Sequence, residues 1–136
     1  MDFRKKIRES KRIVIKFGTN ALTRNNGNIA LSRIYSFIES LVDLKNQGKE
    51  IIIISSGAVS LGYKKLNLET KPDLLNLKQA CAAIGQGQLM SIYEEGFNKF
   101  SVISAQILLT EKDFSIRDRY LSLRNALNTL LKLGVI

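Results

Sequence analysis

Two short runs of β-branched residues mark the first half of the chain. Ile13, Val14 and Ile15 form the first run, and Glu50–Ser55, with the sequence EIIIIS, forms the second. Runs in which successive residues are apolar are typical of strands buried on both faces, as in parallel sheets. Both runs are therefore predicted to be buried strands.

Between the two runs, apolar residues recur at helical spacing over Ile29–Gln47, which predicts an amphipathic helix that ends at Gly48. A strand, a helix and a second strand in this order predict parallel strands joined by a right-handed crossover. The pattern therefore indicates an α/β fold with a mainly parallel sheet.

The second half of the chain contains further elements of both kinds. A short helix over Val59–Leu66 and a polar loop over Asn67–Asp73 are predicted first. Two helical segments, Leu74–Ile84 and Gln88–Phe100, should follow, separated by a break or bend at the glycines between them.

A third strand is predicted over Ser101–Leu109, and a final helix is marked by Tyr120, Leu123, Leu127, Leu130 and Leu131. This helix should end at Gly134. Val135 and Ile136 then have the residue types of another strand. We therefore expect the chain to be cut inside a domain.

Lys16 follows the first run directly, in the stretch Lys16-Phe17-Gly18-Thr19. Open α/β sheets bind ligands beyond the carboxyl ends of their strands. A lysine there is a point charge suited to a phosphate, and Gly18, which has no Cβ, lets the backbone come close to such a ligand. The alternative is a strand-end lysine that reaches into water.

The second strand ends in a turn of small residues, Ser55-Ser56-Gly57-Ala58. Such a turn exposes backbone N–H groups at a helix N-terminus, which favours an anion, and Ser56 adds a hydroxyl donor. A purely structural tight turn is the alternative. If the strands are parallel, this turn and Lys16 lie at the same edge of the sheet.

Two glycine patterns resemble nucleotide-binding motifs without matching them. Gly57 and Gly62 have the spacing of a P-loop, but Tyr63 stands where that loop needs lysine. Gly85-Gln86-Gly87 opens a dinucleotide fingerprint, but Met90 replaces its third glycine. If the protein binds a phosphate, it does so without a P-loop or a dinucleotide-binding motif.

Composition narrows the classes of function. The 136 residues suffice for one domain and contain no histidine, which excludes Ser-His and Cys-His catalysis and histidine-ligated metals. Cys81, the single cysteine, lies among small residues and is expected to be packed rather than nucleophilic. No apolar run is long enough to span a bilayer, and Met1–Arg12 lacks the apolar segment of a signal peptide. We therefore expect a cytoplasmic protein with no membrane partner.

The net charge of +9 raises the question of nucleic-acid binding. Much of the excess precedes the first strand, and no pattern of alternating basic and aromatic residues appears. The basic residues concerned are Arg4, Lys5, Lys6, Arg8, Lys11 and Arg12. A solvated N-terminal extension explains them better than a nucleic-acid surface does.

Four blocks of the chain together resemble the amino-acid kinase family. They are residues 13–23 (IVIKFGTNALT), 54–62 (ISSGAVSLG), 78–89 (KQACAAIGQGQL) and 106–110 (QILLT), in the family's order. The Lys-x-Gly-Thr at residue 16 resembles the branch that acts on L-glutamate. The resemblance implies a three-layer α/β/α sandwich on a mainly parallel sheet, with the amino acid bound by the N-terminal half and ATP by the C-terminal half.

The activity implied by the resemblance is ATP-dependent phosphorylation of the γ-carboxylate of L-glutamate, the first step of proline biosynthesis. By resemblance, Lys16 contacts the transferred phosphoryl group, and Gly18 and Thr19 cradle the phosphates. Ser56, Gly57 and Ala58 resemble the turn that binds glutamate. Mg²⁺ would be held mainly through the nucleotide phosphates, and no residue of this chain is assigned to a metal.

The family's acidic and nucleotide-binding residues would lie beyond Ile136, so residues 1–136 are expected to be the N-terminal, amino-acid-binding part of one kinase domain. Glu111, Asp113 and Asp118 are instead expected to favour the N-terminal dipole of the last helix. The complete enzyme is expected to be a homo-oligomer, and this chain alone to be inactive. A decayed kinase remnant and a small basic binding module are the alternatives.

Overall fold

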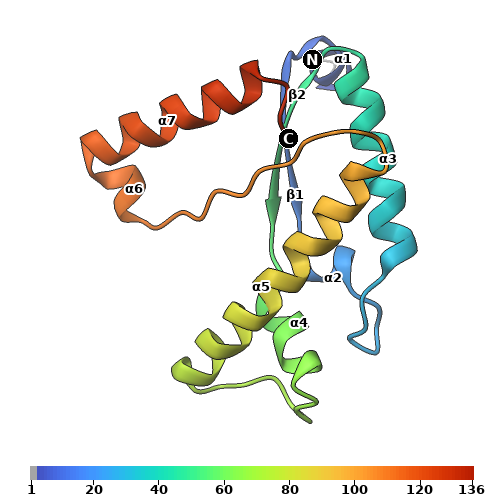
Figure 1. Ribbon diagram of the computed structural model, residues 1–136, viewed down its shortest axis with the longest axis vertical. Helices are drawn as coiled ribbons and strands as arrows, with labels where there is room; N and C mark the ends of the chain where they lie inside the picture. Colours follow the sequence, from blue (N-terminus) through green and yellow to red (C-terminus); the bar gives the residue numbers. More distant parts are fainter. Residues whose placement is uncertain (1–2) are drawn as a thin grey trace.

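Two parallel strands form the sheet of the structure, a computed structural model that describes residues 3–136 (Figure 1). β1 covers Arg12–Phe17 and β2 covers Glu50–Ser55. Their register runs from Arg12 opposite Glu50 to Phe17 opposite Ser55. The two predicted strands and their parallel pairing are thus confirmed.

Helices make up most of the remaining described chain. They are α1 (Phe3–Glu9), α2 (Thr19–Leu22), α3 (Leu31–Asn46), α4 (Ala58–Lys65), α5 (Leu75–Asn98), α6 (Lys112–Ser115) and α7 (Arg117–Lys132). The helices predicted over Ile29–Gln47 and Val59–Leu66 correspond to α3 and α4, and the final helix corresponds to α7. The short helices α1, α2 and α6 were not expected, and every residue of α1 is exposed.

Two glycines end α3 and α7 as predicted. Gly48 follows α3 with a φ of 84°, and Gly134 follows α7 with a φ of 73°. These left-handed conformations favour glycine, which has no Cβ to clash with the backbone. The chain can therefore turn directly from α3 into β2.

The sheet is covered on one face. Ile51 is buried, and Ile13, Ile15 and Ile53 pack against the same core cluster, to which α3 and α5 contribute. On the opposite face, Val14 is 56% exposed and Ile54 is 50% exposed. The expectation that both strands are buried on both faces is therefore wrong, because helices among residues 3–136 cover only one face.

α5 is one continuous helix, so the break predicted between Leu74–Ile84 and Gln88–Phe100 is wrong. Its glycines serve close packing instead. A Cβ added at Gly85 would overlap the carbonyl oxygen of Ala58 and lie 2.7 Å from the nitrogen of Gly62. A Cβ added at Gly62 would lie 2.8 Å from the Cα of Cys81. α4 and α5 therefore cross with their backbones in contact.

The segment Ser101–Leu109, predicted as a third strand, is not a strand of the sheet. It runs as an irregular chain across the molecule before α6 (Figure 1). Among residues 3–136, only Ile136 bonds to it as a neighbouring strand would: the Ile136 N–H donates to Ile103 O at 3.0 Å, and Ala105 N–H donates to the Ile136 carbonyl at 2.8 Å. A β-strand needs hydrogen-bond partners along its whole length, and residues 3–136 provide such partners for this segment only at Ile103 and Ala105.

The core lies between the sheet, α3 and α5. Its most deeply buried side chains are Phe97, Leu22, Ile34, Ile38, Ile51, Leu89 and Cys81. The complete burial of Cys81 agrees with the packing role predicted for it. Within residues 3–136, no helix combines the length and apolar character needed to cross a membrane.

Candidate functional site

The carboxyl ends of β1 and β2 are tied together by Ser56. Its backbone N–H donates to the carbonyl of Phe17 at 3.0 Å, and its hydroxyl donates to the same oxygen at 3.2 Å. The turn after β2 is thereby fixed beside the turn after β1. The sequence-based expectation that these two turns share one edge of the sheet agrees with this geometry.

Thr19 brings the two turns into side-chain contact. Its Oγ1 lies 3.4 Å from Ser56 Oγ, and either hydroxyl can donate. Gly18, which precedes it, has a φ of −75°, so its backbone does not require glycine. A Cβ at Gly18 would meet no atom within 4 Å. The space above Gly18 is open to a ligand.

Gly57 makes the transition from β2 to α4. Its φ of 107° lies in the left-handed region, where a side chain is strained. α4 then begins at Ala58, so the turn presents the N-terminus of an eight-residue helix. The first N–H groups of a helix have no partner inside it and are suited to an anion.

Lys16 stands apart from these contacts. It is exposed and lines a hollow on the open side of β1 together with Arg4 and Ile7 of α1. No hydrogen bond or ion pair within the described chain joins Lys16 to Thr19 or Ser56. The structure therefore brings Gly18, Thr19, Ser56, Gly57 and Ala58 together and leaves Lys16 outside this group.

Two supporting contacts were not predicted from the sequence. Ser55 Oγ and the hydroxyl of Tyr93 on α5 are 2.9 Å apart, which holds the end of β2 to the core. Burial raises the pKa of Tyr93, and the Ser55 hydrogen bond opposes that rise. Arg33 of α3 donates to the carbonyls of Asn20 at 2.9 Å and Thr23 at 3.4 Å, which anchors α2. No local pattern in the sequence indicates either contact.

The acidic residues considered above do not gather into a site. Asp113 accepts hydrogen bonds from the N–H and the hydroxyl of Thr110, at 2.6 and 2.7 Å, and these bonds lower its pKa. It lies in the first turn of α6, whereas Asp118 lies in the first turn of α7 as expected. In the part of the chain that the structure describes, no three acidic or cysteine side chains are grouped to hold a metal ion.

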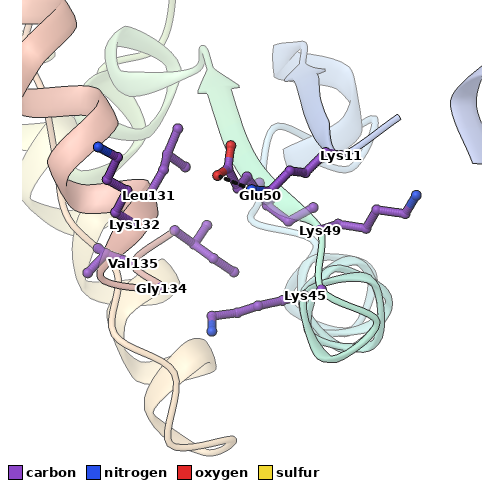
Figure 2. Close-up of a pocket in the computed structure, with 11 residues that line it drawn as sticks. Lys11, Lys45, Lys49, Glu50, Leu131, Lys132, Gly134 and Val135 are labelled. Atoms are coloured by element: carbon purple, nitrogen blue, oxygen red, sulfur yellow. Dashed lines mark ion pairs between the residues drawn. The ribbon is translucent and has the colours of Figure 1, made fainter. Parts of the chain in front are cut away.

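A cavity of about 350 Å³ lies at the opposite edge of the sheet, at the amino end of β2 (Figure 2). Glu50 projects into the cavity. The pKa of Glu50 is lowered, and the main cause is the hydrogen bond that Arg12 donates to it at 2.8 Å. Lys45 and Lys132 line the cavity from the last turns of α3 and α7, where cations stabilise the helix dipole. None of the predicted site residues borders this cavity.

Comparison with known proteins decides the family. Residues 11–136 match the sequence profile of the Amino acid kinase family. The chain belongs to this family. The family resemblance seen in the sequence is thereby confirmed, and the small parallel sheet with its helices is consistent with the family fold.

Several relatives within the amino acid kinase family are similar along nearly the whole chain. A protein named glutamate 5-kinase from Caldanaerobacter subterraneus is 50% identical over 125 residues, which cover 92% of this chain and 34% of the relative. Another from Marinomonas sp. is 40% identical over 136 residues, covering 100% of this chain and 36% of the relative. The chain thus spans about a third of the length of the curated relatives it matches.

Proposed function

We propose that this chain supplies the amino-acid-binding part of a kinase that phosphorylates the γ-carboxylate of L-glutamate with ATP. The observation that carries the proposal is the joining of the two turns by Ser56, which places Thr19 and the start of α4 around one edge of the sheet. This edge is where open α/β sheets bind ligands. The relatives are named glutamate 5-kinase, which suggests glutamate as the substrate.

In this proposal the turn Ser56-Gly57-Ala58 binds a carboxylate of glutamate. The donors are the free N–H groups at the start of α4, together with the Ser56 hydroxyl once it turns from Phe17 O to the ligand. Gly18 and Thr19 cradle the phosphates, since the backbone at Gly18 is open to a ligand. Lys16 swings from the exposed face of β1 to the transferred group.

The reaction moves the γ-phosphoryl group of ATP to a γ-carboxylate oxygen of glutamate. A new O–P bond forms, the bond to the bridging oxygen breaks, and ADP leaves with the electron pair. Phosphoryl transfer depends on positioning and on charge neutralisation more than on covalent chemistry. A lysine and convergent N–H groups supply both.

Mg²⁺ would reach this site with the nucleotide. Mg²⁺ commonly bridges substrate phosphates through one or two carboxylates and several waters. Asp113 is held by Thr110, and the acidic residues considered above do not gather into a metal site among residues 3–136, so we assign none of them to the metal. Glutamate and ATP are the proposed substrates.

A chimera tests the proposal. The 125 matching residues of the Caldanaerobacter relative are replaced by those of this chain, and ADP release is measured with and without glutamate. Glutamate-dependent turnover supports the proposal. A chimera that melts cooperatively but shows no such turnover contradicts it.

Within the chimera, Lys16→Ala should lower kcat by about 10²–10³-fold and change the KM for glutamate little, because charge develops on the phosphoryl group in the transition state. Lys65→Ala, at the exposed end of α4, is the matched control and should retain full turnover. An unchanged kcat in the Lys16 variant would show that Lys16 does not stabilise the transition state.

A further inference from the structure

A second, strongly basic hollow adjoins the candidate site. It has a volume of about 560 Å³ and is lined from four chain segments by Arg24, Arg33, Lys64 and Lys71. Thr19 borders it as well and is the residue it shares with the candidate site. Neither Lys16 nor the Ser56-Gly57-Ala58 turn lines it.

The four cations have no acidic partners there. The residues lining the hollow include no aspartate or glutamate. No ion pair among residues 3–136 involves any of the four side chains. A protein usually surrounds clustered cations with carboxylates, so an unbalanced cluster in a hollow indicates an anionic ligand.

The walls of the hollow are held in place by the fold. Arg33 is fixed by the carbonyls of Asn20 and Thr23. Arg24 lies in a tight loop closed by its own N–H, which donates to Asn28 O at 2.7 Å, and by Gly27 N–H, which donates to Arg24 O at 2.8 Å. The side chain of Arg33 and the backbone of Arg24 are therefore held in place.

Lys64 is placed over this loop from α4. A Cβ added at Gly27 would lie 3.2 Å from Lys64 Nζ and 3.3 Å from the hydroxyl of Tyr63. Gly27 has a φ of 80°, so glycine both permits the turn and leaves room for these side chains. The Lys64 ammonium and the Tyr63 hydroxyl thus lie close to the loop at Gly27, and both residues line the hollow.

We propose that this hollow binds a small phosphate-bearing anion at a site separate from the kinase centre. Its volume lies in the range of ligand pockets, about 300–1,000 Å³, and exceeds what one carboxylate fills. Arginine forks match phosphate oxygens bidentately, and lysines add point charges. The hydroxyl of Tyr63 supplies a further donor. This proposal stands independently of the proposed function.

The test is calorimetric titration of the 136-residue chain with inorganic pyrophosphate. The double variant Arg24→Gln/Lys71→Gln removes two lining charges. The control Lys65→Gln/Lys112→Gln removes two exposed charges that do not line the hollow, so both variants have the same net charge. Thermal melts show whether both variants are folded.

We expect saturable one-to-one binding that weakens with added salt. The lining variant should bind at least tenfold more weakly, the lower range for losing a hydrogen bond to a charged group. The control should bind like the unchanged chain. Lys16→Ala should also bind normally, which separates this site from the kinase centre.

Three results would overturn the proposal. Non-saturable binding, or equal weakening in the lining variant and its control, would indicate a diffuse charge effect. Loss of binding in Lys16→Ala but not in the lining variant would place the anion at the turn after β1. If the double variant does not fold, the two single variants are measured against their single controls by the same criteria.

Discussion

Ser56 directs two donors, its N–H and its hydroxyl, at the same carbonyl oxygen of Phe17. This redundancy matters for mutagenesis. When the hydroxyl is removed, the backbone bond still holds the turn beside β1. The hydroxyl can therefore be tested for ligand binding without dismantling the site.

In the active chimera, Ser56→Ala should raise the KM for glutamate and leave the KM for ATP unchanged. Losing one hydrogen bond to a charged group costs about 1.5–3 kcal/mol. Ser91→Ala is a suitable control, because Ser91 also donates to a backbone carbonyl, at 3.0 Å, but lies on the exposed side of α5. Equal weakening for both substrates would mean that the turn is structural or serves the nucleotide.

At the scale of elements, the crossing of α4 and α5 depends on glycine. Gly85→Ala should destabilise the chain by about 1–3 kcal/mol, because its Cβ would press on the backbone of Ala58 and overpacking a close contact costs this much. Denaturant unfolding measures the change.

Gly87→Ala is the matched control for this prediction. It lies two residues along the same helix, and an added Cβ would meet nothing within 4 Å. Because glycine is a poor helix former, this change should stabilise α5 by up to about 1 kcal/mol. Similar effects of the two substitutions would show that the crossing tolerates a side chain.

The elements that could be predicted from the sequence are those whose signal is local. The runs at Ile13–Ile15 and Glu50–Ser55 are β-branched over several residues, and α3 has a regular apolar stripe. Gly85 and Gly87 led to the wrong prediction of a break in α5. A glycine can either end a helix or allow a neighbouring helix to pack closely, and only the position of α4 shows which of these roles applies. Ser101–Leu109 has the residues of a strand, but pairing depends on a distant partner.

The candidate site divides in the same way. Ser56 and Thr19 were predictable because parallel strands end at one edge, and the stretches that follow them are short. Ser55 and Tyr93, which are hydrogen-bonded, are 38 positions apart in the sequence. Arg33 and Asn20, whose hydrogen bond anchors α2, are 13 positions apart. No local pattern could predict either contact. Arg24, Arg33, Lys64 and Lys71 converge only after folding, so no spacing in the sequence reveals the basic hollow.

At the scale of the whole molecule, the open face of the sheet exposes apolar side chains. Val14 and Ile54 lie on it, and β1 has no neighbouring strand on its outer edge among residues 3–136. An uncovered apolar face beside an unpaired strand edge favours association. We therefore expect the 136-residue chain to elute above its monomer mass at micromolar concentration.

The double variant Val14→Lys/Ile54→Lys should shift the chain toward the monomer, as measured by size-exclusion chromatography with light scattering. Phe3→Lys/Leu133→Lys adds the same charge at exposed apolar positions outside the sheet and should change elution little. A monomeric unchanged chain, or equal shifts in both variants, would show that this face does not drive association.

The backbone contact between α4 and α5 also has a mechanical consequence. α5 has 24 residues, so at 1.5 Å per residue it is about 36 Å long, and it crosses α4 near its middle. Because the two backbones are in contact at Gly62 and Gly85, a tilt of α5 would press directly on α4. A tilt of about 5° moves an end about 18 Å from the crossing by about 1.5 Å. Gly96, near that end, lies against Tyr35 and Ile38 of α3, so a displacement of α3 would be transmitted through α5 to the start of α4, next to Ser56.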